Sequence, residues 1–176
     1  MSQGPKPKSH PKSAKNAPGY TSTDGILDQW RRERPDLDCT PMGVIGDLWR
    51  AGENIRQGVV ENWSRYDLDF PMADVILTLR RQGHGQALSP SQLAGDMMLS
   101  TSAMTNRLDK LEKRGLIERR PDPEDRRGLK IVLTDAGFAL ADEVVVTHVE
   151  TEERLIAGLN AEERDQLRAL LQKVMG

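Results

Sequence analysis

The 176-residue sequence contains few aromatic residues and a single cysteine. Aromatic residues make up only 4% of the chain, so a hydrophobic core has to be built mainly from Leu, Val, Ile, Met and Ala. Cys39 has no second cysteine with which to form a disulfide or a zinc cluster. We interpret it as a structural thiol in a reducing cytoplasm, with a redox sensor as the alternative.

The sequence also lacks the patterns of membrane spans and of common catalytic sites. No apolar run approaches the roughly 20 residues that span a bilayer, and no secretory signal pattern is found, so we expect a cytoplasmic protein without a membrane partner. His10, His84 and His148 have no partners at metal-ligand spacing. Because a glycine-rich phosphate loop, a nucleophile elbow and a catalytic dyad are missing too, we expect neither an enzyme nor a bound cofactor or metal.

The net charge of −2 conceals an uneven distribution along the chain. Residues 1–22 carry four lysines and no acidic residue, and their content of Pro, Lys, Ser and Gly predicts a disordered basic arm. Residues 100–130 contain nine basic and six acidic residues, whereas residues 131–176 contain four basic and nine acidic ones. A polyanion such as DNA would therefore meet the first two segments and avoid the last.

Residues 23–176 are predicted to form one mainly helical domain. Its first helix carries Ile26, Leu27 and Trp30 on one face and is stopped by Pro35. Capping signals at Thr40, Asp69, Thr134 and Asn160 begin the later helices. The helices expected outside the central segment cover residues 24–34, 40–66, 69 to about 83, 135–158 and 161–175.

The central segment, residues 89–133, predicts a winged helix-turn-helix. A capping box at Ser89 opens a short helix that ends at Met98 or Leu99. Ser100 is expected to cap a second helix, which stops at Gly115. After it, two short strands at 116–120 and 130–133 flank a polar turn at 122–128.

The second helix of this segment is amphipathic in a way that suits DNA. Met104, Leu108 and Leu111 fall on its core face, and small polar side chains on the other face can reach base edges while basic ones meet phosphates. Arginines at the hairpin tip suit phosphate or minor-groove contacts. The alternative is a solvated polar helix beside a charged turn, but the order helix, helix, hairpin and long helix favours DNA binding. The predicted DNA-binding residues are Ser100, Ser102, Thr105, Asn106, Arg107, Lys110, Arg126 and Arg127.

Several of these stretches resemble one protein family. Residues 116–120, residues 122–127 and the Leu-Thr-Asp-Ala-Gly sequence at 133–137 resemble the MarR family of bacterial transcriptional regulators, over about residues 40–176. Asp28-Gln29-Trp30, residues 34–38 and residues 104–108 are similar to its urate-responsive PecS/HucR/UrtR branch.

The resemblance implies an architecture and an activity. It implies a mainly α fold with a small β-hairpin wing, in which the winged helix-turn-helix is flanked by N- and C-terminal dimerisation helices at 40–66, 135–158 and 161–175. It also implies a homodimer that binds double-stranded DNA at a pseudo-palindromic operator and represses transcription.

The resemblance further implies a small-molecule effector, urate or a related purine, that releases the DNA. The matching ligand-binding residues are Trp30, Asp74, Arg107 and Arg119. An indole can stack on a planar heterocycle, and guanidinium groups can pair with its anion. Each residue has a structural alternative: Trp30 packs its helix on the domain, Asp74 and Arg119 form an ion pair, and Arg107 contacts DNA.

The residues leave other regulators open as well. One alternative is a DNA-binding regulator or architectural protein without a small-molecule switch, whose lysine arm wraps the duplex. The others are a regulator that senses phenolic ligands and one that senses oxidation through Cys39.

Overall fold

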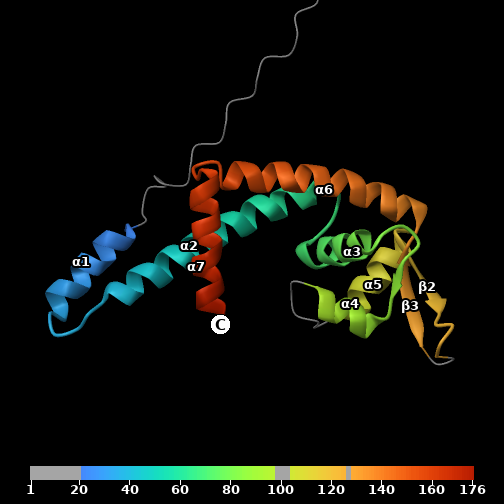
Figure 1. The fold of residues 1–176 in the computed structure, drawn as a ribbon, viewed down its shortest axis with the longest axis horizontal. Coiled ribbons are helices and arrows are strands. Elements are labelled where there is room, and N and C mark those ends of the chain that lie inside the picture. Colours follow the sequence, from blue (N-terminus) through green and yellow to red (C-terminus); the bar gives the residue numbers. More distant parts are fainter. Residues whose placement is uncertain (1–20, 98–103, 126–127) are drawn as a thin grey trace, which may run out of the picture. The chain divides into compact units, whose positions relative to one another are not determined.

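The computed structural model describes residues 21–97, 104–125 and 128–176 (Figure 1). Within these ranges the chain forms seven helices and a three-stranded antiparallel sheet, which confirms the predicted fold class. The chain divides into two compact units, Met1–Asn54 and Ile55–Gly176, and each is described by itself.

The first unit contains α1 (Thr23–Glu33) and the first part of α2 (Thr40–Ser64). The two helices meet closely, since a methyl group added at Gly43 would lie 2.9 Å from Leu27 Cδ1. Hydrogen bonds from Thr23 Oγ1 to Asp47 Oδ1 (2.6 Å) and from Arg50 to the Thr21 carbonyl (2.7 Å) join them further. Leu27 is the buried residue of the predicted apolar face of α1.

The ends of α2 differ slightly from the prediction. Thr40 lies inside the helix and not before it, and the Asp38 carboxylate accepts a hydrogen bond from its N–H (3.0 Å). The helix ends at Ser64, two residues earlier than expected, because a turn follows in which Asp67 has a positive φ of 53°.

The second unit is built around α3 (Phe70–Gln82), which begins and ends as predicted, with Asp69 as N-cap and Gly83 as C-cap. Its side chains Ala73, Val75 and Ile76 are completely buried. Around it lie α4 (Pro90–Asp96), α5 (Met104–Lys113) and the sheet, whose own buried residues complete one hydrophobic core.

The sheet has the order β1-β3-β2, with β1 (Ala87–Leu88), β2 (Ile117–Pro121) and β3 (Leu129–Leu133). The predicted hairpin is β2 and β3, paired in a register that sets Arg119 opposite Ile131. The sequence prediction missed β1, which pairs with the other edge of β3. Two residues are too few for the alternation of hydrophobic and polar side chains that marks a strand.

Two helices follow the sheet, α6 (Asp135–Leu155) and α7 (Ala161–Met175). The capping box that opens α7, formed by Asn160 and Glu163, is confirmed. Arg164 of α7 binds Glu153 of α6 through two hydrogen bonds of 2.7 and 2.8 Å, and this bonding holds the pKa of Glu153 below its usual value. α6 ends three residues before the predicted boundary.

The start of α6 is hydrogen-bonded to the short segment between α5 and β2. The Thr134 hydroxyl donates to the Gly115 carbonyl (2.6 Å) and accepts from the Gly137 N–H (3.0 Å). Gly137 approaches the strand so closely that an added methyl group would lie 1.8 Å from the Leu116 backbone oxygen. That oxygen already accepts a hydrogen bond from the Thr134 N–H (3.1 Å), so it cannot move aside freely.

We expect Gly137→Ala to lower the free energy of unfolding by about 3 kcal/mol, because the first turn of α6 has to move away from β2. Urea denaturation followed by circular dichroism, at one fixed protein concentration, measures the effect. The control is Gly95→Ala in α4, where an added methyl group meets nothing within 4 Å. This variant is expected to gain up to about 0.5 kcal/mol, and equal stabilities of the two variants would contradict the close approach.

Candidate nucleic-acid interface and effector site

The helix-turn-helix begins at α4, whose N-terminus is held by the predicted capping box. The Gln92 N–H donates to Ser89 Oγ (3.2 Å), and the Ser89 N–H donates to Gln92 Oε1 (2.9 Å). The helix ends at Asp96, earlier than the predicted Met98 or Leu99. The predicted N-cap of the next helix, Ser100, and the predicted DNA contact Ser102 lie outside the described residues.

The recognition helix α5 has the two faces that the sequence predicts. Leu108 is 3% exposed and Leu111 is completely buried. On the opposite face Thr105, Asn106 and Lys110 are exposed to solvent, and Arg107 is half-buried. The exposed face is therefore polar, and the buried face is apolar.

The C-terminal end of α5 is tied to the loop between α2 and α3. Arg114 donates to the carbonyl oxygens of Asp67 (2.6 Å) and Tyr66 (3.0 Å). Directly after it, Gly115 adopts a φ of +68°, which ends the helix as predicted. The sequence pattern does not single out Arg114, because a basic residue in the last turn of a helix is common on any solvated surface.

Arg119 joins the wing to the recognition helix. Its guanidinium binds Asp109 Oδ1 (2.6 Å) and Glu112 Oε2, and its backbone N–H donates to Glu112 Oε1 (3.2 Å). The Arg119 side chain is only 21% exposed. Burial works to lower the pKa of Arg119, but hydrogen bonds and charges of the two carboxylates outweigh it and raise the pKa above its ordinary value. The wing strand and α5 are thus connected through one permanently charged side chain.

The end of the wing hairpin next to its turn is connected to α4 by a second cation. Lys130 Nζ donates to Gln92 Oε1 (3.2 Å) and lies 3.4 Å from Asp122 Oδ2. The predicted DNA contacts at the tip of the wing, Arg126 and Arg127, lie outside the described residues. The sequence prediction missed Gln92, Asp122 and Lys130 as a group because no local spacing relates them.

The predicted effector residues come from both units. Asp74 is buried on α3, Arg107 is half-buried on α5, and Arg119 is half-buried on β2. These elements are neighbours in the second unit, since α3 contacts α5 and α5 contacts β2. Trp30 belongs to the first unit, where it is 41% exposed. The carboxylates that hold Arg119 are Asp109 and Glu112, two residues that the sequence prediction missed.

The sequence contains only a weak signal for Asp109 and Glu112 as partners of Arg119. Asp109 and Glu112 are three residues apart on α5, so they lie on the same side of the helix, and the arginine that binds them follows on the next strand. Such a pair of acids is far more common as part of a solvated helix face, which is why it carries no prediction alone.

Within the described residues no cluster of three or more His, Cys, Asp or Glu side chains is arranged to hold a metal ion. No helix of residues 21–97, 104–125 and 128–176 combines the length and the hydropathy needed to cross a membrane.

Comparison with known proteins places this arrangement in a family. The MarR family model matches residues 74–129. The chain is 44% identical over 155 residues to the HTH-type transcriptional regulator PecS of Dickeya dadantii, covering 88% of this chain and 93% of PecS.

Two solved structures share the fold. AbsC, a MarR family transcriptional regulator from Streptomyces coelicolor, has a TM-score of 0.71 at 23% identity over 79% of this chain and 94% of its own. BpsR of Bordetella bronchiseptica, whose DNA binding is regulated by 6-hydroxynicotinic acid, has a TM-score of 0.67 at 26% identity over 75% of this chain and 92% of its own. This chain belongs to the MarR family of DNA-binding transcriptional regulators.

Proposed function

We propose that this protein is a transcriptional repressor that binds a pseudo-palindromic operator as a homodimer and is released from it by urate or a related planar purine. The observation that carries the proposal is the position of Arg119. Its guanidinium holds the wing strand to Asp109 and Glu112 of the recognition helix. A ligand anion that competes for this arginine would act directly on the element that reads DNA.

The DNA-reading part of the proposal rests on α5 and the wing. Thr105 and Asn106 are exposed near the N-terminal end of α5, where short hydroxyl and amide side chains can bind base edges in the major groove. Lys110 lies one turn further along the helix and is placed to meet a phosphate. Arg126 and Arg127 in the wing turn are proposed to add phosphate or minor-groove contacts.

The ligand part rests on the chemistry of four side chains. Arg107 and Arg119 offer planar guanidinium groups to an enolate-like anion, and Trp30 offers an exposed indole face for stacking. Asp74 is a buried carboxylate that a ligand anion would repel or deprive of a cationic partner. The regulation of BpsR by 6-hydroxynicotinic acid, a small planar heterocycle, supports a ligand of this shape.

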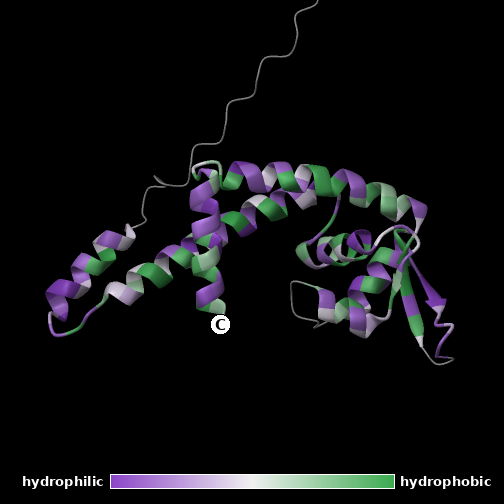
Figure 2. Cartoon of the chain, in the orientation of Figure 1, coloured by the Kyte–Doolittle hydropathy of each residue, from purple (hydrophilic) through white to green (hydrophobic). Residues whose placement is uncertain are grey.

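The dimer part rests on apolar surface that the second unit leaves exposed. Figure 2 shows hydrophobic residues interspersed along α6 and α7. α7 has no buried residue in the described chain, although Leu170 and Val174 are apolar and 58% and 64% exposed. Val146 and Val149 of α6 are 57% and 58% exposed. We propose that a second copy covers these faces, since a two-fold dimer doubles the contacts with a symmetric operator.

The first unit exposes apolar surface of its own. Trp49 is 77% exposed and lines a hollow of about 390 Å³ on α2. The other residues that line this hollow are Pro41, Met42, Ile45 and Gly46. We propose that this face also belongs to the dimer interface, because a large exposed patch of this kind marks an interaction surface.

We expect the wild-type protein to sediment as a dimer at micromolar concentration and Leu170→Glu to weaken the dimer by at least about tenfold, because a carboxylate would be buried in an apolar interface. Analytical ultracentrifugation over a concentration series measures this. Gln172→Glu adds the same charge to an exposed polar position of α7 and is expected to leave the dimer intact. A monomeric wild type would contradict the proposal.

We expect urate to weaken binding to a duplex selected from a random library, and Trp30→Ala to raise the urate concentration required by about tenfold, because the stacking surface is lost. Fluorescence anisotropy of the labelled duplex is the measurement, with xanthine, 6-hydroxynicotinate and salicylate tested in parallel. Gln29→Ala, an exposed neighbour on α1, is the control. Binding that no purine changes would favour a regulator without this switch, and a response to salicylate alone would favour a phenolic effector.

Arg119→Lys tests the contact of Arg119 with Asp109 and Glu112. Lysine keeps the charge but cannot bind Asp109 and Glu112 through a planar fork, so we expect the free energy of unfolding to fall by about 1 kcal/mol and the response to urate to weaken. The salt dependence of DNA binding should stay that of the wild type, since the net charge is unchanged. A full urate response in this variant would remove Arg119 from the switch.

A further inference from the structure

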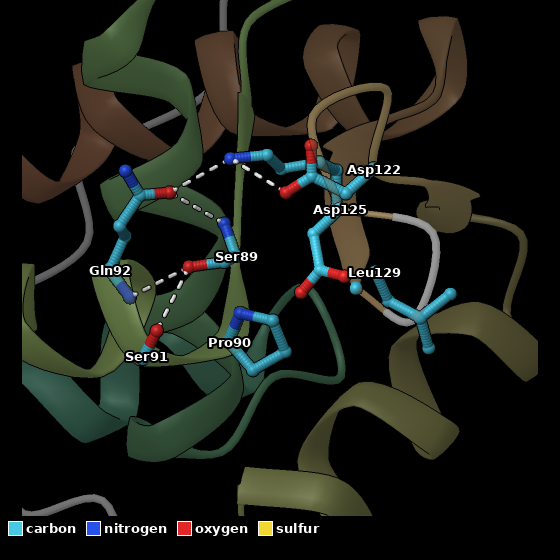
Figure 3. Close-up of a pocket in the computed structure, with 9 residues that line it drawn as sticks. Ser89, Pro90, Ser91, Gln92, Asp122, Asp125 and Leu129 are labelled. Atoms are coloured by element: carbon cyan, nitrogen blue, oxygen red, sulfur yellow. Dashed lines mark hydrogen bonds and ion pairs between the residues drawn. The ribbon is translucent and has the colours of Figure 1, made fainter.

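A second joint holds the wing where the hairpin enters its turn. We call the three side chains that form it the wing brace: Lys130 of β3, Gln92 of α4 and Asp122, the residue directly after β2. Lys130 Nζ donates to Gln92 Oε1 (3.2 Å) and lies 3.4 Å from Asp122 Oδ2. Figure 3 shows Gln92 and Asp122 facing each other from the two sides of a groove. The groove measures about 600 Å³ and also includes Ser91, Asp125 and Leu129 among its lining residues.

On the helix side, the brace connects to a capping box. Gln92 Oε1 accepts from Lys130 Nζ and also from the Ser89 N–H (2.9 Å), while the Gln92 N–H donates to Ser89 Oγ (3.2 Å). A change in the direction of the Gln92 side chain would therefore break the cap of α4. Lys130 is therefore bonded to the side chain that caps α4, the first helix of the helix-turn-helix.

On the wing side, the brace ends at the first residue of the turn. Asp122 Oδ1 accepts from the Glu124 N–H (3.0 Å), and the Asp122 N–H donates to the Gly128 carbonyl (3.0 Å). The Asp122 side chain is only 12% exposed. A carboxylate so far removed from water requires a cation nearby, and Lys130, itself 23% exposed, supplies it.

We propose that Lys130 is a positioning residue, which sets the wing against the helix-turn-helix through Gln92 and Asp122 instead of binding a phosphate itself. The inference rests on the proposed function, in which the wing turn contacts DNA. It goes beyond it by assigning the direction of the wing to a specific group of side chains on α4 and the sheet.

A wing lysine can bind a phosphate or position the wing, and the two roles predict opposite changes in DNA affinity for Asp122→Asn. This substitution removes a negative charge from a DNA-facing element, so charge alone would tighten DNA binding. It also takes away the ionic partner of Lys130, whereas the amide oxygen can still accept from the Glu124 N–H. If the brace positions the wing, we expect Asp122→Asn to bind the selected duplex about tenfold more weakly than the wild type.

Lys130→Met separates the roles when it is measured with and without Asp122→Asn. A lysine that binds a phosphate contributes to the affinity for DNA in both backgrounds. A positioning lysine contributes about tenfold in the wild type and little once Asp122→Asn has already broken the joint. Arg120→Met is the matched control, because Arg120 is paired with Lys130 in the ladder, is exposed and carries the same charge. Lys130→Arg, which can still reach both partners, is expected to restore most of the affinity.

The effects of these substitutions on DNA binding are also expected not to add. The double variant Lys130→Met with Asp122→Asn is expected to bind about as weakly as either single variant, because both break the same joint. Gln92→Met breaks the other half of the brace, together with the Ser89 N–H bond of the α4 cap, without changing the charge. Unchanged DNA binding in this variant would contradict the brace should Asp122→Asn fail to fold. Circular dichroism melting identifies such a failure.

The outcomes separate the inference from the function on which it rests. A wild type that binds no duplex overturns the proposed function. A wild type that binds, together with Asp122→Asn or Gln92→Met at wild-type affinity or tighter, overturns the brace alone. A double variant that binds more weakly than both single variants, or equal losses in Lys130→Met and Arg120→Met, also overturns it and makes Lys130 a phosphate contact or a general charge.

Discussion

The DNA-reading part of this protein depends on the ionic joint between Arg119 and the two carboxylates of α5. Ile117, Ile131 and Val132 anchor the sheet in the core, whereas β2 becomes more exposed from Arg119 to Pro121. Arg119 connects this part of the wing to α5, because its planar guanidinium reaches Asp109 and Glu112 at once. The position of the outer part of the wing relative to the proposed recognition helix therefore depends on this joint.

Other contacts connect α5 and the wing to the rest of the second unit. Arg114 fastens the end of α5 to the carbonyl oxygens of Tyr66 and Asp67, and Thr134 with Gly137 fixes α6 to the segment that follows α5. The Tyr66 hydroxyl also lies 3.0 Å from Thr147 Oγ1 on α6. The proposed recognition helix is thus connected by short polar contacts to α6, where the proposed dimer surface lies.

The sequence predicts local features well and long-range pairs poorly, for a physical reason. Capping boxes such as the one at Ser89 depend on residues three positions apart, and the fold class follows from the succession of such signals. The partners of Arg119 and of Lys130 lie on other elements, so no spacing in the sequence reveals them. β1 was missed because its extended conformation depends on pairing with β3 and not on a pattern in its own two residues. Trp30, Asp74 and Arg107 could be named from resemblance alone, which gives their identity without their contacts.

The same joint gives the proposed release an electrostatic component. Asp109 and Glu112 lie on α5, the proposed recognition helix, and their side chains are 60% and 40% exposed. While Arg119 binds them, one of their two negative charges is compensated, and the repulsion of a DNA phosphate is reduced. A ligand anion that draws Arg119 away leaves both carboxylates uncompensated beside a polyanion, so the helix loses its attraction for DNA as well as its support.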